Sequence, residues 1–211
     1  MGHLLPEHGT FLHVGCGSKR AANTPFAGLH WHEIRLDIDP AAKPNLIGTI
    51  TDMSAVENGA LDALFSSHNI EHLYPHEVPL ALAEFRRVLK PSGFALITCP
   101  DLRSVCAQVA ADQLTEAAYV SPAGPIAPID ILYGHRASMQ AGNLYMAHRC
   151  GFTEKVLVGS LSAAGFTQIV SITRPAAFDL WALATTEQWP ENELRYAAAR
   201  MFPSTASTSP G

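Results

Sequence analysis

The chain has 211 residues, of which 47% are hydrophobic and only 16% are charged, and this composition is typical of one globular domain with a full core. The net charge is −5 without any block of Lys or Arg, which argues against nucleic acid or an anionic membrane as the partner. We expect a cytoplasmic protein with free thiols, because the sequence shows no signal peptide, membrane-spanning stretch or C-x-x-C pair.

The first predicted elements are two strands joined through a glycine turn. An apolar strand over residues 11–14 leads into a Gly-Cys-Gly turn at 15–17, and a second strand over 32–37 ends at Asp37. Glycines let the backbone approach a ligand closely, and an acid at this position can bind two ribose hydroxyls. Arg20 replaces the third glycine of a dinucleotide fingerprint, and there is no GxxxxGK[ST] phosphate loop. The pattern favours an adenosine cofactor without phosphates, S-adenosylmethionine.

Strands and helices alternate along the rest of the chain. This order predicts an α/β fold with a mostly parallel sheet covered by helices on both faces. The last two strands have no helix between them, which suggests one antiparallel strand at the edge of the sheet. The further strands are expected at residues 45–48, 61–66, 94–99, 166–173 and 178–185, and the helices at 75–89, 103–113 and 153–164.

A segment rich in Gly and Pro interrupts this alternation at residues 119–152. A connection of this length inside a compact domain is usually functional or disordered, and its polar content favours a lid that binds the acceptor. We expect residues 1–190 to form one domain that includes this segment, and residues 191–211 to form a tail that is mobile from Pro203 onward. The candidate acceptor-binding residues of the segment are Tyr133, His135, Arg136 and His148, and Arg136 would favour a carboxylate or phosphate on the acceptor.

Five motifs follow one another along the chain: Leu12-His-Val-Gly-Cys-Gly17, Leu36-Asp-Ile-Asp-Pro40, Leu61-Asp-Ala-Leu-Phe-Ser66, His68-Asn-Ile-Glu-His72 and Glu84-Phe-Arg-Arg-Val-Leu-Lys-Pro-Ser-Gly93. Together they resemble the class I S-adenosylmethionine-dependent methyltransferases, in particular small bacterial proteins with a type 11 methyltransferase domain. The resemblance covers residues 11–185 and implies a Rossmann-like sheet of order 3-2-1-4-5-7-6 with strand seven antiparallel. It also implies S-adenosylmethionine as cofactor, S-adenosylhomocysteine as product and a small-molecule acceptor.

The resemblance also implies site residues at the turn after each of the first four strands. His68 and His135 are the candidate bases for an acceptor that carries a proton. The chain departs from the family at Thr49, where relatives often carry an acid that holds the adenine amino group. The candidate cofactor-binding residues are Gly15, Cys16, Gly17, Asp37, Ile38, Asp52, Met53, Ser67 and His68.

Two other functional classes stay open. The spacing His68-x-x-Glu71-His72 matches H-x-x-E-H, a zinc-hydrolase motif that needs both histidines on one helix face. Glu71 and His72, with His76, could instead hold a metal that assists methyl transfer. No third ligand has a recognisable spacing, so we expect no metal. The second class is a non-catalytic module that binds the cofactor or a partner, because a fold does not establish chemistry. In either case we expect a monomer or a homodimer.

Overall fold

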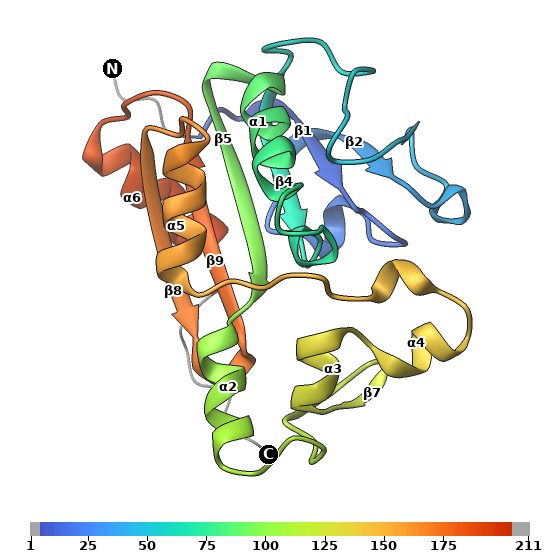
Figure 1. The fold of residues 1–211 in the computed structure, drawn as a ribbon. Helices are drawn as coiled ribbons and strands as arrows, with labels where there is room; N and C mark the ends of the chain where they lie inside the picture. The colour runs from blue at the N-terminus through green and yellow to red at the C-terminus, as the bar shows by residue number, and fades with distance from the viewer. Residues whose placement is uncertain (1–4, 204–211) are drawn as a thin grey trace.

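The computed structural model describes residues 5–203, and within them a seven-stranded sheet forms the centre of the molecule (Figure 1). Its order is β3-β2-β1-β4-β5-β9-β8, and β9 is the one strand of the described sheet that runs in the opposite direction to the others next to it. Because β8 and β9 are the sixth and seventh strands of this sheet along the chain, the order 3-2-1-4-5-7-6 is confirmed. The antiparallel strand is second from the edge rather than at the edge. The strands are β1 (His8–Val14), β2 (His30–Asp37), β3 (Leu46–Ile47), β4 (Leu61–Ser67), β5 (Leu89–Pro100), β8 (Gln168–Arg174) and β9 (Asp179–Thr185).

The two faces of the sheet carry separate apolar clusters, because successive side chains of a strand point to opposite faces. Leu12 and Leu64 belong to the cluster that packs against α1 (Val78–Val88) and α5 (Glu154–Ala163), which lie on one face of the sheet (Figure 1). Their neighbours Phe11 and Phe65 belong to the second cluster on the opposite face. Helices therefore cover both faces, as the alternating pattern predicts.

Residues 191–201 form a helix, α6 (Glu191–Met201), where the sequence predicts the start of a tail. Leu194, Ala197 and Met201 of this helix pack with Phe11 in the second cluster. The tail prediction is wrong over these residues, because the apolar side chains at helical spacing cover a sheet face that has no other long helix in the described chain. The predicted mobility of residues 204–211 lies outside the described residues.

The strand after α1 begins earlier than predicted. β5 (Leu89–Pro100) starts directly at the end of α1, and the segment Lys90-Pro-Ser-Gly93 lies inside it rather than forming a separate turn. The register between β4 and β5 shifts between Leu61 and Ala63, so the extra residues form a local bulge that lets the chain continue in the sheet.

The segment 119–152 is more regular than a loop. It contains a small hairpin of β6 (Tyr119–Ser121) and β7 (Gly124–Ile126), followed by α3 (Pro128–Tyr133) and α4 (Arg136–Gln140). It follows α2 (Leu102–Ala110), which leaves the end of β5, and it lies beyond the carboxyl ends of β1 and β4 (Figure 1). No helix in residues 5–203 is long and apolar enough to cross a membrane.

Candidate active site

A cavity of about 340 Å³ lies at the carboxyl edge of the sheet. This is where open α/β sheets bind their ligands. Its walls are the turns that follow β1, β2, β3 and β4, together with part of the segment 119–152. The lining residues are Gly15, Gly17, Leu36, Asp37, Ile38, Asp39, Ala42, Gly48, Thr49, Ile50, Thr51, His68, Asn69, His72, Leu73, Glu77, Asn143, Tyr145, Met146 and Arg149.

Asp37 ties the glycine turn to the end of β2. The Gly17 N–H donates to Asp37 Oδ2 at 2.7 Å, and the Asp39 N–H donates to Asp37 Oδ1 at 2.9 Å. Each carboxylate oxygen can accept a second hydrogen bond, so both oxygens keep a lone pair for a ligand. The carboxylate is thus held in place at the cavity wall before any ligand arrives.

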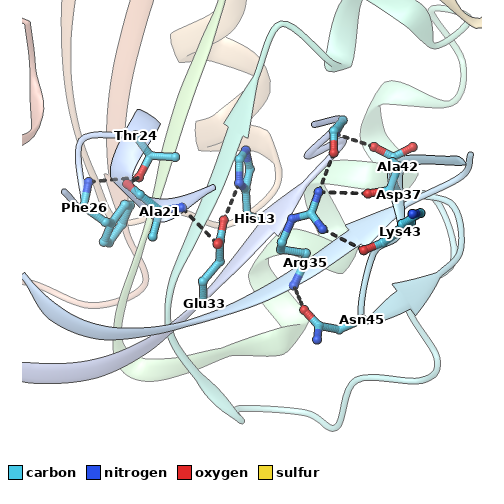
Figure 2. A network of polar contacts seen from close by, with 11 residues as sticks. His13, Ala21, Thr24, Phe26, Glu33, Arg35, Asp37, Ala42, Lys43 and Asn45 are labelled. Carbon is cyan, nitrogen blue, oxygen red and sulfur yellow. Dashed lines mark hydrogen bonds and ion pairs between the residues drawn. The ribbon is translucent and has the colours of Figure 1, made fainter. Parts of the chain in front are cut away.

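Arg35, which the sequence analysis did not single out, organises the backbone on both sides of Asp37 (Figure 2). Its side chain is 4% exposed and donates to the carbonyl of Gly17 in the first turn. The same guanidinium donates to the carbonyls of Ala42 at 3.1 Å and Lys43 at 2.7 Å, beyond β2. One cation therefore joins the two turns that flank the cavity. An arginine inside a strand offers no sequence signal for this role.

A histidine–carboxylate contact joins β1 and β2 near Arg35 (Figure 2). His13 is 1% exposed, and its Nδ1 lies 2.8 Å from Glu33 Oε1. The other oxygen of Glu33 accepts from the Ala21 N–H at 2.9 Å. Burial lowers the pKa of His13, while Glu33 opposes this effect. His13 therefore supports the segment that follows the glycine turn from inside the core, in agreement with its position in the first predicted strand.

Four of the candidate cofactor-binding residues do not line the cavity. The Cys16 N–H donates to Leu36 O, and burial raises the pKa of its thiol to about 12. The Met53 side chain is buried in the core, and its N–H donates to Glu84 at 2.7 Å. Asp52 accepts from the Ser54 N–H, and Ser67 is paired within the sheet opposite Thr98. Residues 48–51 line the wall instead.

His68 lines the cavity, as predicted, and adopts a backbone conformation that is uncommon for residues with a side chain. Its φ is +50°, and its N–H donates to Thr98 O at 2.8 Å. Non-glycine residues in this region are strained and gather at functional sites. The imidazole is 47% exposed, so it is accessible to a ligand in the cavity.

The segment 119–152 reaches the cavity with other residues than those predicted. Tyr133 is 63% exposed but does not line it, and His135 Nδ1 lies 2.7 Å from Ser138 Oγ. Arg136 binds both carboxylate oxygens of Asp130, at 2.6 and 3.0 Å, so its charge is already paired. The lining residues Asn143, Tyr145, Met146 and Arg149 are all contributed by the end of the segment. The end of the segment therefore lies at the cavity, whereas Tyr133, His135, Arg136 and His148 lie outside its lining.

The ion pair between Arg136 and Asp130 predicts a pH dependence of stability. Hydrogen bonding to Arg136 lowers the pKa of the buried Asp130 from 3.8 to about 2. The stability from this lowered pKa is present above 3.8 and is lost as the pH falls through about 2. Because Arg136 is half exposed, we expect Asp130→Asn to cost about 1 kcal/mol at neutral pH. Urea unfolding at several pH values should show this difference shrink below 3.8, and a difference that is constant with pH would contradict it.

The H-x-x-E-H motif does not form the helix that a zinc hydrolase needs. His68 precedes a single turn of 3-10 helix, η3 (Ile70–His72), and α1 begins only at Val78. The two histidines of the motif therefore do not share one helix face, and the hydrolase interpretation loses its structural basis. His72 instead reaches the cavity wall.

Solved structures with the same fold come from several organisms. A protein from Pyrococcus horikoshii OT3 is 16% identical, with a TM-score of 0.58 over 84% of this chain and 82% of that one. A possible histamine N-methyltransferase from Thermotoga maritima is 16% identical, with a TM-score of 0.56 over 87% and 84% of the two chains. The 1,6-didemethyltoxoflavin-N1-methyltransferase of Burkholderia thailandensis, with S-adenosylhomocysteine bound, is 17% identical, with a TM-score of 0.53 over 85% and 72%. These likenesses establish the fold.

A domain match covers the part of the sequence that carries the site. A family model described as a methyltransferase domain matches residues 12–97, which include the glycine turn, Asp37 and His68. This match and the shared fold support a class I S-adenosylmethionine-dependent methyltransferase. No curated protein sequence matches this chain.

The methyltransferase-domain match supports S-adenosylmethionine as the cofactor, and the cavity has features that fit it. Gly17 has a φ of +49°, and a Cβ built on it would point into open space, so the turn leaves room for a ligand against its backbone. A Cβ on Gly15 would lie 2.5 Å from the Asn69 side chain, so glycine is also required there. Asn69 Nδ2 is buried without a hydrogen-bond partner among the described residues and is available to a bound ligand.

Proposed function

We propose that this methyltransferase transfers a methyl group to a small-molecule acceptor that binds in the cavity beside Tyr145 and Arg149. The observation that carries the proposal is the composition of this one cavity, which has the glycine turn and Asp37 on one side and the end of the segment 119–152 on the other. A volume of about 340 Å³ is in the range of small-molecule sites. The net charge of −5 disfavours a nucleic-acid acceptor.

In this proposal, the turns after β1 and β2 hold the cofactor. Asp37 accepts hydrogen bonds from the ribose, and the exposed side chain of Ile38 packs against the adenine. The backbone of residues 48–51 takes the position of the adenine-binding acid that Thr49 replaces. Gly17 and Asn69 contact the methionine part through the open space and the unpartnered amide described above.

S-adenosylmethionine supplies an electrophilic methyl group on a sulfonium that is a good leaving group, so the protein mainly has to align the acceptor with it. His68 is the candidate base for an acceptor that carries a proton, because it is accessible from the cavity. His135 is a weaker candidate, since it lies outside the cavity lining and contacts Ser138. The proposal includes a monomer or homodimer in the cytoplasm, a location that the four free cysteines support.

A screen of small metabolites with S-adenosylmethionine labelled on its methyl group tests the proposal. We expect label on at least one small product, and His68→Ala should lower its formation at neutral pH. Binding of S-adenosylhomocysteine without labelled product from any acceptor would favour the non-catalytic module. Label on protein or RNA, with none on small molecules, would contradict the acceptor class.

The wall of the cavity predicts which tyrosine of the segment contacts the acceptor. Tyr145 lines the cavity and is 56% exposed, whereas Tyr133 is 63% exposed outside the lining. We expect Tyr145→Ala to lower kcat/KM for the acceptor about tenfold, with the Kd of S-adenosylhomocysteine changed less than about threefold. Tyr133→Ala is the matched control and should leave both constants near the wild-type values. Equal effects of the two substitutions would contradict this assignment of the wall.

A further inference from the structure

Glu71, His72 and His148 form a cluster at the edge of the cofactor cavity, in which Glu71 is buried and the two histidines are partly buried. One potential ligand atom from each residue lies within 4.8 Å of the other two. Glu71 is 1% exposed, and neither of its carboxylate oxygens has a hydrogen-bond partner among the described residues. His68 Nδ1 lies 3.4 Å from Glu71 Oε1, but this contact lacks hydrogen-bond geometry. A buried carboxylate without a hydrogen bond is costly, so this one requires an explanation.

Both histidines of the cluster have one ring nitrogen fixed by a backbone carbonyl. His72 Nδ1 lies 3.1 Å from Ala147 O, and His148 Nδ1 lies 2.7 Å from Ile131 O. A carbonyl can only accept, so Nδ1 carries the hydrogen in both rings, and in a neutral ring Nε2 keeps its lone pair. Metal-binding histidines have this arrangement, in which a carbonyl fixes the ring and the other nitrogen binds the ion.

Three acceptors meet in this cluster. The Glu71 carboxylate lies beside the two Nε2 lone pairs of His72 and His148, and a cation among them would satisfy all three.

We propose that Glu71, His72 and His148 bind one divalent transition-metal ion at the edge of the cofactor cavity. Two imidazoles and one carboxylate are a ligand set that Zn²⁺ and its neighbours prefer, whereas Mg²⁺ and Ca²⁺ prefer oxygen ligands. The side chains have to close on the ion, because zinc–ligand distances are about 2.0–2.2 Å. His72 also lines the cavity, so an open coordination position would face the acceptor side.

The sequence alone predicts no metal because the third candidate ligand, His148, lies outside the local motif. His148 is far from Glu71 along the chain, and the backbone of the same segment brings it back to η3. The Arg149 N–H donates to Glu71 O at 2.8 Å, and the Cys150 N–H donates to the same carbonyl at 3.2 Å. The expectation of no metal was based on the lack of a third ligand, and the structure offers His148 as that ligand. His148, and not His76, is therefore the candidate third ligand beside Glu71 and His72.

Zinc titration of the chelator-treated full-length chain by calorimetry tests the site without using enzyme activity. We expect one Zn²⁺ per chain, and Co²⁺ in its place should give the visible absorption of a site with nitrogen ligands. His148→Ala, His72→Ala and Glu71→Gln should each weaken binding at least about tenfold. His76→Ala is the matched control, since His76 is an exposed histidine that stacks on Tyr74, and it should bind Zn²⁺ like the wild type.

The outcomes are separable from those of the methyl-transfer screen. If Glu71→Gln fails to fold by circular dichroism, the two histidine variants decide the question. Absence of zinc binding in the wild type would show that the cluster holds protons rather than a metal and would overturn the proposal. Binding that survives His148→Ala and His72→Ala, or that His76→Ala abolishes, would overturn it as well.

Discussion

Asp37→Ala is expected to weaken binding of S-adenosylhomocysteine roughly 30- to 700-fold, which corresponds to about 2–4 kcal/mol. The loss has two sources. The ribose would lose a charged acceptor for its hydroxyls, and the Gly17 N–H would lose the partner that holds the glycine turn in place. Calorimetry on the purified variant measures the change, and circular dichroism shows whether the variant is folded. A folded variant with unchanged affinity would refute the assignment of Asp37 to the ribose.

Asp52→Ala is the matched control for this experiment. It removes the same charge from the same edge of the sheet, but Asp52 is exposed, accepts from the Ser54 N–H and does not line the cavity. We expect its affinity for S-adenosylhomocysteine to stay within about twofold of the wild type. A loss as large as that of Asp37→Ala would mean that net charge, and not the position of the carboxylate, sets the affinity.

The parts of the site that the sequence predicts are those that depend on short stretches of chain. The glycine turn and Asp37 each follow directly from an apolar strand, and parallel strands bring their carboxyl ends to one edge. Knowledge of the strand order is then sufficient to place both beside His68, and all of these residues line the cavity. The order itself follows from the resemblance of the motifs, because alternation alone suggested an antiparallel strand at the edge.

The parts that the sequence does not predict depend on contacts between distant residues. Arg136 is a plausible anion-binding group by composition, but Asp130, six residues earlier, already neutralises it. Asn143 and Tyr145 reach the cavity because the segment returns to Glu71, and no periodicity in the chain encodes this return. The sequence also does not predict helix α6, because its apolar face is small and is recognisable only when the sheet face that it covers is known.

Arg35→Met is expected to lower the free energy of unfolding by about 2–4 kcal/mol. Methionine keeps the length of the side chain but leaves the carbonyls of Gly17, Ala42 and Lys43 without their donor inside the protein. Urea unfolding followed by circular dichroism measures the loss. Lys43→Met is the matched control, because it removes the same charge from an exposed side chain and leaves the Lys43 carbonyl in place. It should change stability by less than about 0.5 kcal/mol.

Arg35→Met should also weaken cofactor binding, because Arg35 holds the backbone of the glycine turn. Arg35 does not line the cavity, yet it is bonded to Gly17, whose N–H in turn binds Asp37. Release of the turn should therefore weaken S-adenosylhomocysteine binding about tenfold in Arg35→Met, although no direct contact is removed. The affinity of Arg35→Lys for S-adenosylhomocysteine should lie between those of the wild type and Arg35→Met, since a single ammonium cannot reach both turns at once. A variant that is destabilised but binds with wild-type affinity would show that Arg35 supports the fold alone and that the glycine turn is held by Asp37 without its help.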